Sequence, residues 1–220
     1  MPKARLTITA LLCLLATAAL ALAVAHQSVP YGFEDPALNW LGPPSALRAW
    51  GRLTELLTAP AVFAALFAAL VVGLLKRATW RVLFYAALAV TAFFISEHVA
   101  KPLVQRTYEE ELTFPSGSVT AVSATVLAIW FALGPRLGRR ARIVAVAIGV
   151  AWVLLITLAV VGAHWHTPMD ALGSILLSVG IVTAGAALFE SAGARRLSVR
   201  VGRRFETVGR GSRAGSVTRR

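Results

Sequence analysis

The chain alternates between long apolar stretches and short polar segments. Six stretches of about 20 residues carry few charges, and this is the length that a helix needs to cross ~30 Å of hydrocarbon. We predict membrane spans at about residues 6–26, 57–75, 80–100, 118–134, 143–163 and 170–190. The pattern therefore predicts an all-α polytopic membrane protein, a bundle of six transmembrane helices.

The composition agrees with a membrane protein. Hydrophobic residues make up 57% of the 220 positions, whereas roughly 45–50% is usual for a soluble domain. Cys13 is the single cysteine, so the chain can form neither an internal disulfide nor a thiol metal site. We expect no metal and no cofactor.

The distribution of basic residues predicts the orientation. With six spans, both termini and two of the connecting segments lie on one side, and they hold 18 of the 22 Lys and Arg residues. The remaining four are Arg48, Arg52, Lys101 and Arg106. The positive-inside rule then places the protein in the cell membrane with both termini in the cytoplasm. The net charge of +12 reflects this bias and contact with anionic lipid, and not nucleic-acid binding.

Three regions follow from these patterns. Residues 1–56 contain the first span and an outer interfacial loop, residues 57–193 form the transmembrane core, and residues 194–220 form a basic tail that we expect to be disordered beside the anionic inner leaflet. Prolines in the loop argue against a long regular helix there. The first span could also be a signal peptide ending at Ala23-Val24-Ala25, but its long apolar run favours a retained helix.

The ionisable residues of the core gather at the outer ends of the last four spans. No span carries such a residue near its middle, which argues against a transporter or proton pump. In the first polar segment, Lys101 and Arg106 stand five residues apart and can hold the oxygens of a phosphate. The alternatives are that both side chains extend to the membrane interface, or that Glu97 and Lys101 form an i,i+4 ion pair.

The second polar segment is Pro115-Ser116-Gly117-Ser118, where the fourth span begins. A small turn at a helix start leaves backbone N–H groups free, and these groups attract an anion. The alternative is an ordinary serine N-cap.

The third polar segment runs from His164 to Asp170, where the sixth span begins. His166 with Asp170 four residues later can act as a nucleophile or base that its carboxylate partner orients. Thr167, Pro168 and Asp170 also fit the N-cap, first-turn proline and acidic residue of a capping box. Both interpretations can hold together, because capping would fix the carboxylate beside the imidazole.

Together these segments resemble the type 2 phosphatidic acid phosphatase (PAP2) family. The family pattern is a Lys followed by an Arg, then Pro-Ser-Gly-His, then a His with an Asp four residues later, on a core of six helices with the site at the outer face. The resemblance runs from about residue 57 to 190 and implies a metal-free phosphatase acting on a lipid phosphate or diphosphate of the phosphatidic acid or polyprenyl phosphate type. It implies that His166 forms a phosphohistidine, that Asp170 orients it, and that phosphoryl oxygens bind Lys101, Arg106, Ser116 and the N–H of Gly117.

Three positions depart from the family pattern. Ser118 stands where the family has the His that protonates the leaving group, and Tyr108 and Val160 stand where it has arginines. The leaving group of a diphosphate substrate is a phosphate, which needs protonation less than an alkoxide does. The chain could therefore favour diphosphates, or use His164, His98 or Tyr108 as the acid. The alternative function is a relative that binds lipid phosphate or a membrane partner without turnover. No sequence feature indicates an oligomeric state.

Overall fold

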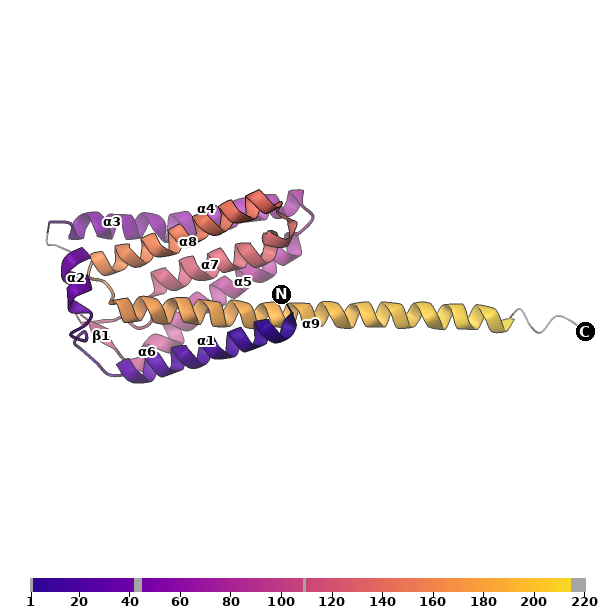
Figure 1. Ribbon diagram of the computed structural model, residues 1–220, viewed down its shortest axis with the longest axis horizontal. Helices are drawn as coiled ribbons and strands as arrows, with labels where there is room; N and C mark the ends of the chain where they lie inside the picture. The colour runs from indigo at the N-terminus through magenta and orange to yellow at the C-terminus, as the bar shows by residue number, and fades with distance from the viewer. Residues whose placement is uncertain (1, 42–44, 109, 215–220) are drawn as a thin grey trace, which may run out of the picture.

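Six long helices lie side by side in the computed structural model (Figure 1). The structure describes residues 2–41, 45–108 and 110–214, with side chains described up to Ser191. Among these described residues, six segments are long and apolar enough to cross a membrane: Lys3–Val24, Leu47–Leu75, Thr79–Val104, Gly117–Arg136, Arg139–Gly162 and Pro168–Ser191. These segments match the six predicted spans, so the predicted all-α bundle is confirmed.

Nine α-helices form the described part of the chain, together with a π-helical turn, a 3-10 turn and one hairpin. The helices of the first half are α1 (Lys3–Val24), α2 (Asp35–Leu41), α3 (Leu47–Leu57), α4 (Ala59–Leu75) and α5 (Thr79–Ile95). The π-helical turn η1 (Ser96–Ala100) and α6 (Lys101–Val104) continue α5. The second half holds α7 (Gly117–Leu133), η2 (Gly134–Arg136), α8 (Arg139–Gly162) and α9 (Pro168–Ala214).

The centre of the bundle is formed by α7 and α9. They are the most buried spans, at 61% and 56% of their apolar windows, and α1, α5 and α8 pack around them. A Cβ on Gly180 of α9 would lie 2.7 Å from the Leu14 side chain, so the glycine allows α1 to approach closely. Small residues serve this purpose between membrane helices in general.

Serine side chains join the beginnings of α7 and α9. The Ser174 hydroxyl lies 3.0 Å from the carbonyl oxygen of Ser116, and the Ser178 hydroxyl lies 3.2 Å from that of Thr120. The N–H of Ser116 also donates to the carbonyl of Asp170. These bonds hold two of the predicted polar segments, far apart in the sequence, against each other.

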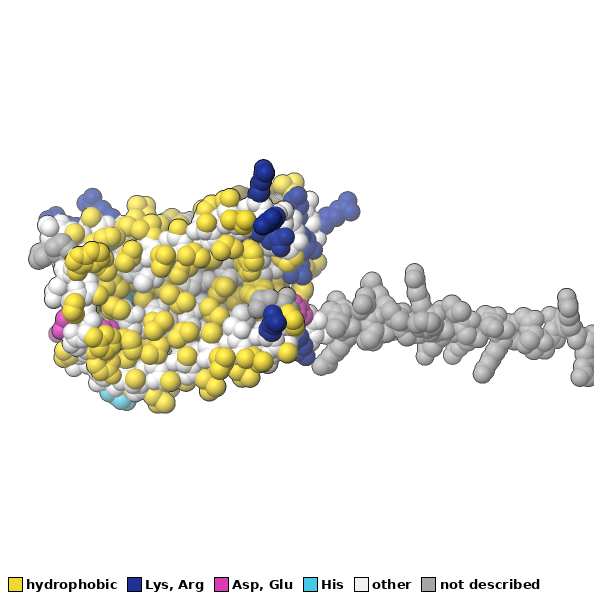
Figure 2. Space-filling model, in the orientation of Figure 1, with side chains coloured by type: hydrophobic (Ala, Val, Ile, Leu, Met, Phe, Trp, Pro, Cys, Tyr) yellow, Lys and Arg dark blue, Asp and Glu magenta, His cyan; other side chains and the backbone are white. Residues whose placement is uncertain are grey.

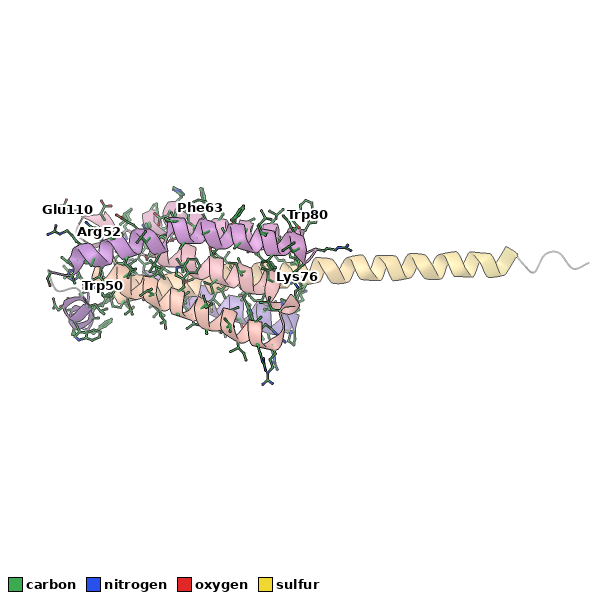
Figure 3. All side chains as sticks on the ribbon, turned by 90° about the horizontal axis from the view of Figure 1, so that it is seen from above. Trp50, Arg52, Phe63, Lys76, Trp80 and Glu110 are labelled. Carbon is green, nitrogen blue, oxygen red and sulfur yellow. The ribbon has the colours of Figure 1, made fainter. Side chains whose placement is uncertain are left out.

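The two ends of the bundle differ. At one end lie α2, α6 and a hairpin in which β1 (Thr107–Tyr108) pairs with β2 (Glu111–Leu112) (Figure 1). Figure 2 shows hydrophobic side chains along the flank, with Lys and Arg gathered mainly at the opposite end, from which α9 extends. Figure 3 places Arg52 and Glu110 at the hairpin end and Lys76 at the basic end.

Two regions differ from the sequence-based expectation. The outer loop contains α2 and α3, and α3 continues through a break at Thr58 into α4, so the second span begins about ten residues earlier than residue 57. The expected disordered tail is instead helical as far as Ala214, because α9 continues and no proline follows Pro168 to end it. Residues 215–220 and the tail's arginine side chains lie outside the described part.

Candidate active site

A cavity of about 330 Å³ opens at the hairpin end of the bundle. It is lined by Lys101, Tyr108, Glu111, Leu112, Thr113, His164, Trp165 and His166. The lining comes from α6, the hairpin and the turn between α8 and α9. The structure therefore brings the first and third predicted polar segments together around one space of suitable size for a small polar group.

The His166 imidazole lies between the cavity and a buried carboxylate. Its Nδ1 atom is 3.9 Å from Oδ2 of Asp170, and only 12% of its side chain is exposed. That distance exceeds a hydrogen bond, and Nδ1 is buried without a hydrogen-bond partner. Catalytic hydrogen bonds are often longer in a substrate-free site and shorten when substrate binds. The two predicted residues are therefore neighbours, but the distance between their side chains is longer than a hydrogen bond.

The surroundings of His166 keep its ring neutral. Burial, together with the positive charges of Lys101 and Arg106, lowers the pKa of His166 to about 3, although a backbone hydrogen bond with Thr113 acts in the opposite direction. A neutral imidazole is the nucleophilic form. The His166 ring is therefore neutral at any pH well above 3.

We expect the His166 ring not to titrate between pH 5 and 8. In histidine-labelled protein, the imidazole resonances that disappear in His166→Gln should keep constant chemical shifts across this range, because the ring gains its proton only near pH 3. An inflection near the ordinary value of 6.5 in those resonances would contradict the described environment.

A capping box fixes Asp170 at the start of α9. The N–H of Thr167 donates to Oδ2 of Asp170 at 2.8 Å, and the N–H of Asp170 lies 3.4 Å from the Thr167 hydroxyl. Pro168 is the first residue of the helix. The capping interpretation of this segment is therefore seen in the structure, and the same cap places the Asp170 carboxylate behind His166. That Asp170 orients His166 as a nucleophile or base stays a prediction.

Arg106 is buried in an ionic cluster. Its Nη1 atom donates to Oδ1 of Asp170 and to the Thr167 hydroxyl, both at 2.8 Å, and its Nη2 donates to Oε2 of Glu34 at 2.7 Å. Only 1% of the Arg106 side chain is exposed. The sequence predicted that Arg106 holds phosphoryl oxygens. In the structure it lies outside the cavity lining, and its two terminal nitrogens bind groups of the protein.

Glu34 is a residue that the sequence analysis missed. It is fully buried, and besides Arg106 its carboxylate accepts hydrogen bonds from the N–H groups of Tyr31 and Met169, at 2.9 and 3.1 Å. The segment assigned as an interfacial loop thus reaches into the cluster and binds the first turn of α9. An acidic residue among apolar and proline residues was the available signal, but the sequence does not name its partners.

The hydrogen bonds keep Glu34 ionised. Burial raises the pKa of Glu34, but hydrogen bonds from the Thr167 side chain, the Tyr31 N–H and Arg106 stabilise the carboxylate more strongly, so that its pKa lies below the ordinary value. The cluster therefore combines one guanidinium with an ionised carboxylate from the loop and the Asp170 carboxylate behind His166. Such a network is rigid when all its members are paired.

Glu97 pairs with Lys101 and lies against the start of α7. The Lys101 ammonium is 2.9 and 3.0 Å from the two carboxylate oxygens. A Cβ on Gly117 would collide with Oε1 of Glu97, so only glycine leaves room for this carboxylate. The π-helical turn η1 carries Glu97, and such turns often occur at functional sites. The predicted i,i+4 pair is present, and an anionic group already occupies the space beside the start of α7.

Ser116 and Ser118 lie at the first turn of α7. Ser116 is the N-cap, and its hydroxyl accepts from the N–H of Val119 at 3.5 Å, as the alternative interpretation expected. Ser118 is half-buried on the first turn. Both serines lie outside the lining of the cavity. The three predicted segments therefore meet at one end of the bundle. The second segment does not line the cavity, and Gly117 at the start of α7 instead contacts Glu97, the partner of Lys101.

The three predicted substitute acids lie in different surroundings. His164 and Tyr108 line the cavity, and Nε2 of His164 is 3.0 Å from the Leu38 carbonyl oxygen. His98 is exposed and packs against Phe94 with tilted rings, and it is not part of the cavity lining. Val160, at the position of a missing family arginine, is fully buried. Within the described ranges, no cluster of three or more His, Cys, Asp or Glu side chains is placed to hold a metal ion.

The fold defines a class of membrane protein that has been seen in a solved structure. The crystal structure of the first transmembrane PAP2 type phosphatidylglycerolphosphate phosphatase from Bacillus subtilis matches with a TM-score of 0.69 and 17% sequence identity. The match covers 83% of this chain and 96% of that chain. At this identity the likeness establishes the fold, a PAP2-type transmembrane bundle.

The family model gives the more particular assignment. Residues 94–193 match the PAP2 superfamily, and this segment contains all three polar segments on which the resemblance was based. A comparison with curated protein sequences finds no match. The predicted resemblance to the PAP2 family is thus confirmed over this segment, and the fold is that of a multi-pass membrane protein of the PAP2 type.

Proposed function

We propose that this protein is a membrane phosphatase that hydrolyses a lipid phosphate or diphosphate through a phosphohistidine at His166. One observation carries the proposal: a neutral imidazole lines a polar cavity, with a buried carboxylate on one side and Lys101 in the same lining. Nucleophile, orienting acid and cation are the groups that phosphoryl transfer to histidine requires.

Two displacement steps account for the reaction. Nε2 of His166 attacks phosphorus, and the bond from phosphorus to the leaving oxygen breaks. The leaving oxygen takes a proton from His164, Tyr108 or water, or departs as an anion when it belongs to a phosphate. Asp170 accepts the Nδ1 proton in a hydrogen bond and stabilises the positive charge that develops on the ring. Water then attacks phosphorus, the P–N bond breaks, and inorganic phosphate leaves with His166 restored.

Lys101 is the cation that contacts the substrate, and Arg106 acts on the site indirectly. The Lys101 ammonium lines the cavity and neutralises charge on the phosphoryl oxygens. Arg106 binds Asp170 and Glu34, so its role is to position the carboxylate behind His166. This differs from the direct phosphate contact that the family resemblance implied.

The substrate is a lipid that reaches the site from one membrane face. The cavity opens where the hairpin meets the ends of the spans, at the height of lipid headgroups. The positive-inside distribution favours cytoplasmic termini and an extracytoplasmic site. A phosphate group can then enter the cavity while the lipid chains stay in the bilayer.

Phosphate release from a panel of lipids tests this proposal. Protein purified in detergent should release phosphate from phosphatidic acid, polyprenyl phosphate or polyprenyl diphosphate, and His166→Ala should release none above background. Equal release by both proteins would exclude His166 as the nucleophile. Saturable binding of these lipids without release by either protein would establish the alternative, a lipid phosphate-binding relative. The departures from the family pattern at Ser118, Tyr108 and Val160 favour this alternative.

Ser118→His should raise turnover of monophosphates. The substitution restores the residue that the family uses to protonate the leaving group, and a general acid contributes about 10²–10⁴-fold in rate. We expect at least about a 10²-fold gain on phosphatidic acid and a smaller gain on a diphosphate, whose leaving group needs protonation less. Ser118→Asn is the matched control. An equal gain in both variants would show that the gain does not come from protonation of the leaving group.

Glu97→Gln should strengthen phosphate binding. The Glu97 carboxylate shares Lys101 with the substrate and occupies the space at Gly117, so an incoming phosphate must displace it. Loss of this charge should lower KM for the lipid phosphate and Ki for inorganic phosphate by roughly 5-fold. A rise in both constants would instead mean that Glu97 holds Lys101 in its binding position.

A further inference from the structure

A second cavity lies in the half of the bundle remote from His166. It has a volume of about 740 Å³ and lies between α4, α7 and α8. Its lining is apolar and includes Ala68 on α4, Leu127 and Trp130 on α7, and Val146 on α8. Trp152 forms part of its wall, and its indole N–H donates to the Leu57 carbonyl at 3.0 Å, which joins α8 to the end of α3.

A basic depression at the end of the bundle adjoins this cavity. The depression is lined by Arg139, Arg142 and Ile143 of α8, and it shares Trp130 and Val146 with the apolar cavity. Both arginines are exposed in the first turn of α8. This turn has no acidic residue and no side-chain cap, so the positive end of the helix dipole adds to the charge of the arginines.

Together, the apolar cavity and the basic depression match the two parts of a phospholipid. The cavity faces the hydrocarbon region, where an unfilled apolar space forfeits dispersion contacts. The depression lies at the level of the headgroups on the basic face. Basic pockets between transmembrane helices on this side are suited to acidic headgroups.

We propose that an anionic phospholipid of the leaflet at the basic end binds here, with an acyl chain between α4 and α8 and its phosphate at Arg139 and Arg142. The lipid fills the space between the two helices and stabilises their packing on α7. This site is separate from the cavity at His166, and it does not depend on the protein being a phosphatase.

The affinity for phosphatidylglycerol tests the site. The protein in detergent is titrated with phosphatidylglycerol or phosphatidylcholine, and the rise in Tm gives the apparent affinity of each lipid. Wild-type protein should prefer phosphatidylglycerol. The double variant Arg139→Gln/Arg142→Gln should bind it about 30-fold more weakly, at roughly 1 kcal/mol for each basic residue.

Two matched controls separate this site from general lipid binding. Arg140→Gln removes a charge from the same turn of α8 but outside the depression, and this variant should retain most of the affinity for phosphatidylglycerol.

Ala68→Phe fills the apolar cavity and should abolish the rise in Tm on adding phosphatidylglycerol. Ala64→Phe lies on the same helix but outside the lining, and it should leave this rise in Tm unchanged. Equal affinity for both lipids, or an undiminished effect in the double arginine variant or in Ala68→Phe, would overturn the proposal. So would a second copy of the chain in this place, detected as a dimer that Ala68→Phe dissociates.

Discussion

Replacing Arg106 by Met should lower the stability of the protein by about 3–5 kcal/mol, because it leaves the Glu34 and Asp170 carboxylates buried without their cation. For a protein of this size, this corresponds to a fall in Tm on the order of 10 °C. Thermal unfolding in detergent micelles, followed by circular dichroism, measures the change. Activity should fall as well, since Asp170 loses one of the groups that fix it behind His166.

The partners of Arg106 provide the controls. Arg48→Met removes an exposed arginine from the same end of the bundle and should leave Tm unchanged. The double variant Arg106→Met/Glu34→Gln should be less destabilised than the sum of the two single variants, because it removes a charge together with its partner. Additive effects, or an unchanged Tm in Arg106→Met, would contradict the described cluster.

The contribution of Glu34 to stability should depend on pH. Its pKa is lower in the folded protein than the ordinary value of 4.5, so its stabilising effect is complete above this value and is lost as the pH falls below it. The Tm difference between wild type and Glu34→Gln should therefore be constant at neutral pH and shrink in acid.

Replacing His166 by Ala should abolish turnover while leaving lipid phosphate binding intact. Loss of a catalytic nucleophile typically lowers kcat by several orders of magnitude, and we expect at least about 10³-fold here. Lys101 and the start of α7 remain in place, so the affinity for inorganic phosphate should change little. Phosphate release and phosphate binding, measured on the same preparation, separate the two effects.

His98→Ala is the matched control for the nucleophile. His98 belongs to the same polar set in the sequence, but it is exposed, packs against Phe94 and lies outside the cavity lining. This variant should keep wild-type activity. If His98→Ala were as inactive as His166→Ala, the cavity described here would not be the site of the chemistry.

Most of the fold follows from local features of the sequence. The six spans are apolar over the length that a bilayer requires, and the caps at Ser116 and Thr167 involve residues within three positions of each other. Each of these interactions depends on neighbours in the chain, so the pattern of residue types is enough to predict it.

The features of the site that the sequence did not predict depend on contacts between residues that are not neighbours in the chain. Glu34 and Arg106 are 72 residues apart, and nothing near either residue indicates the other. The position of the Glu97 carboxylate depends on a π-helical turn and on its approach to Gly117. The proposed role of Arg106 in positioning Asp170, in place of the predicted phosphate contact, rests on the first of these contacts, since a carboxylate from the outer loop binds its second terminal nitrogen.

Trapping of the phosphorylated protein tests the central claim most directly. Wild-type protein is mixed with a lipid phosphate labelled in the phosphoryl group and quenched in alkaline detergent, which preserves phosphohistidine, and the labelled peptide is then identified by mass spectrometry. We predict label on His166 in the wild type and in His98→Ala, and none in His166→Ala. Phosphate release by the wild type with no label on His166, or with label on another residue, would contradict the proposed mechanism.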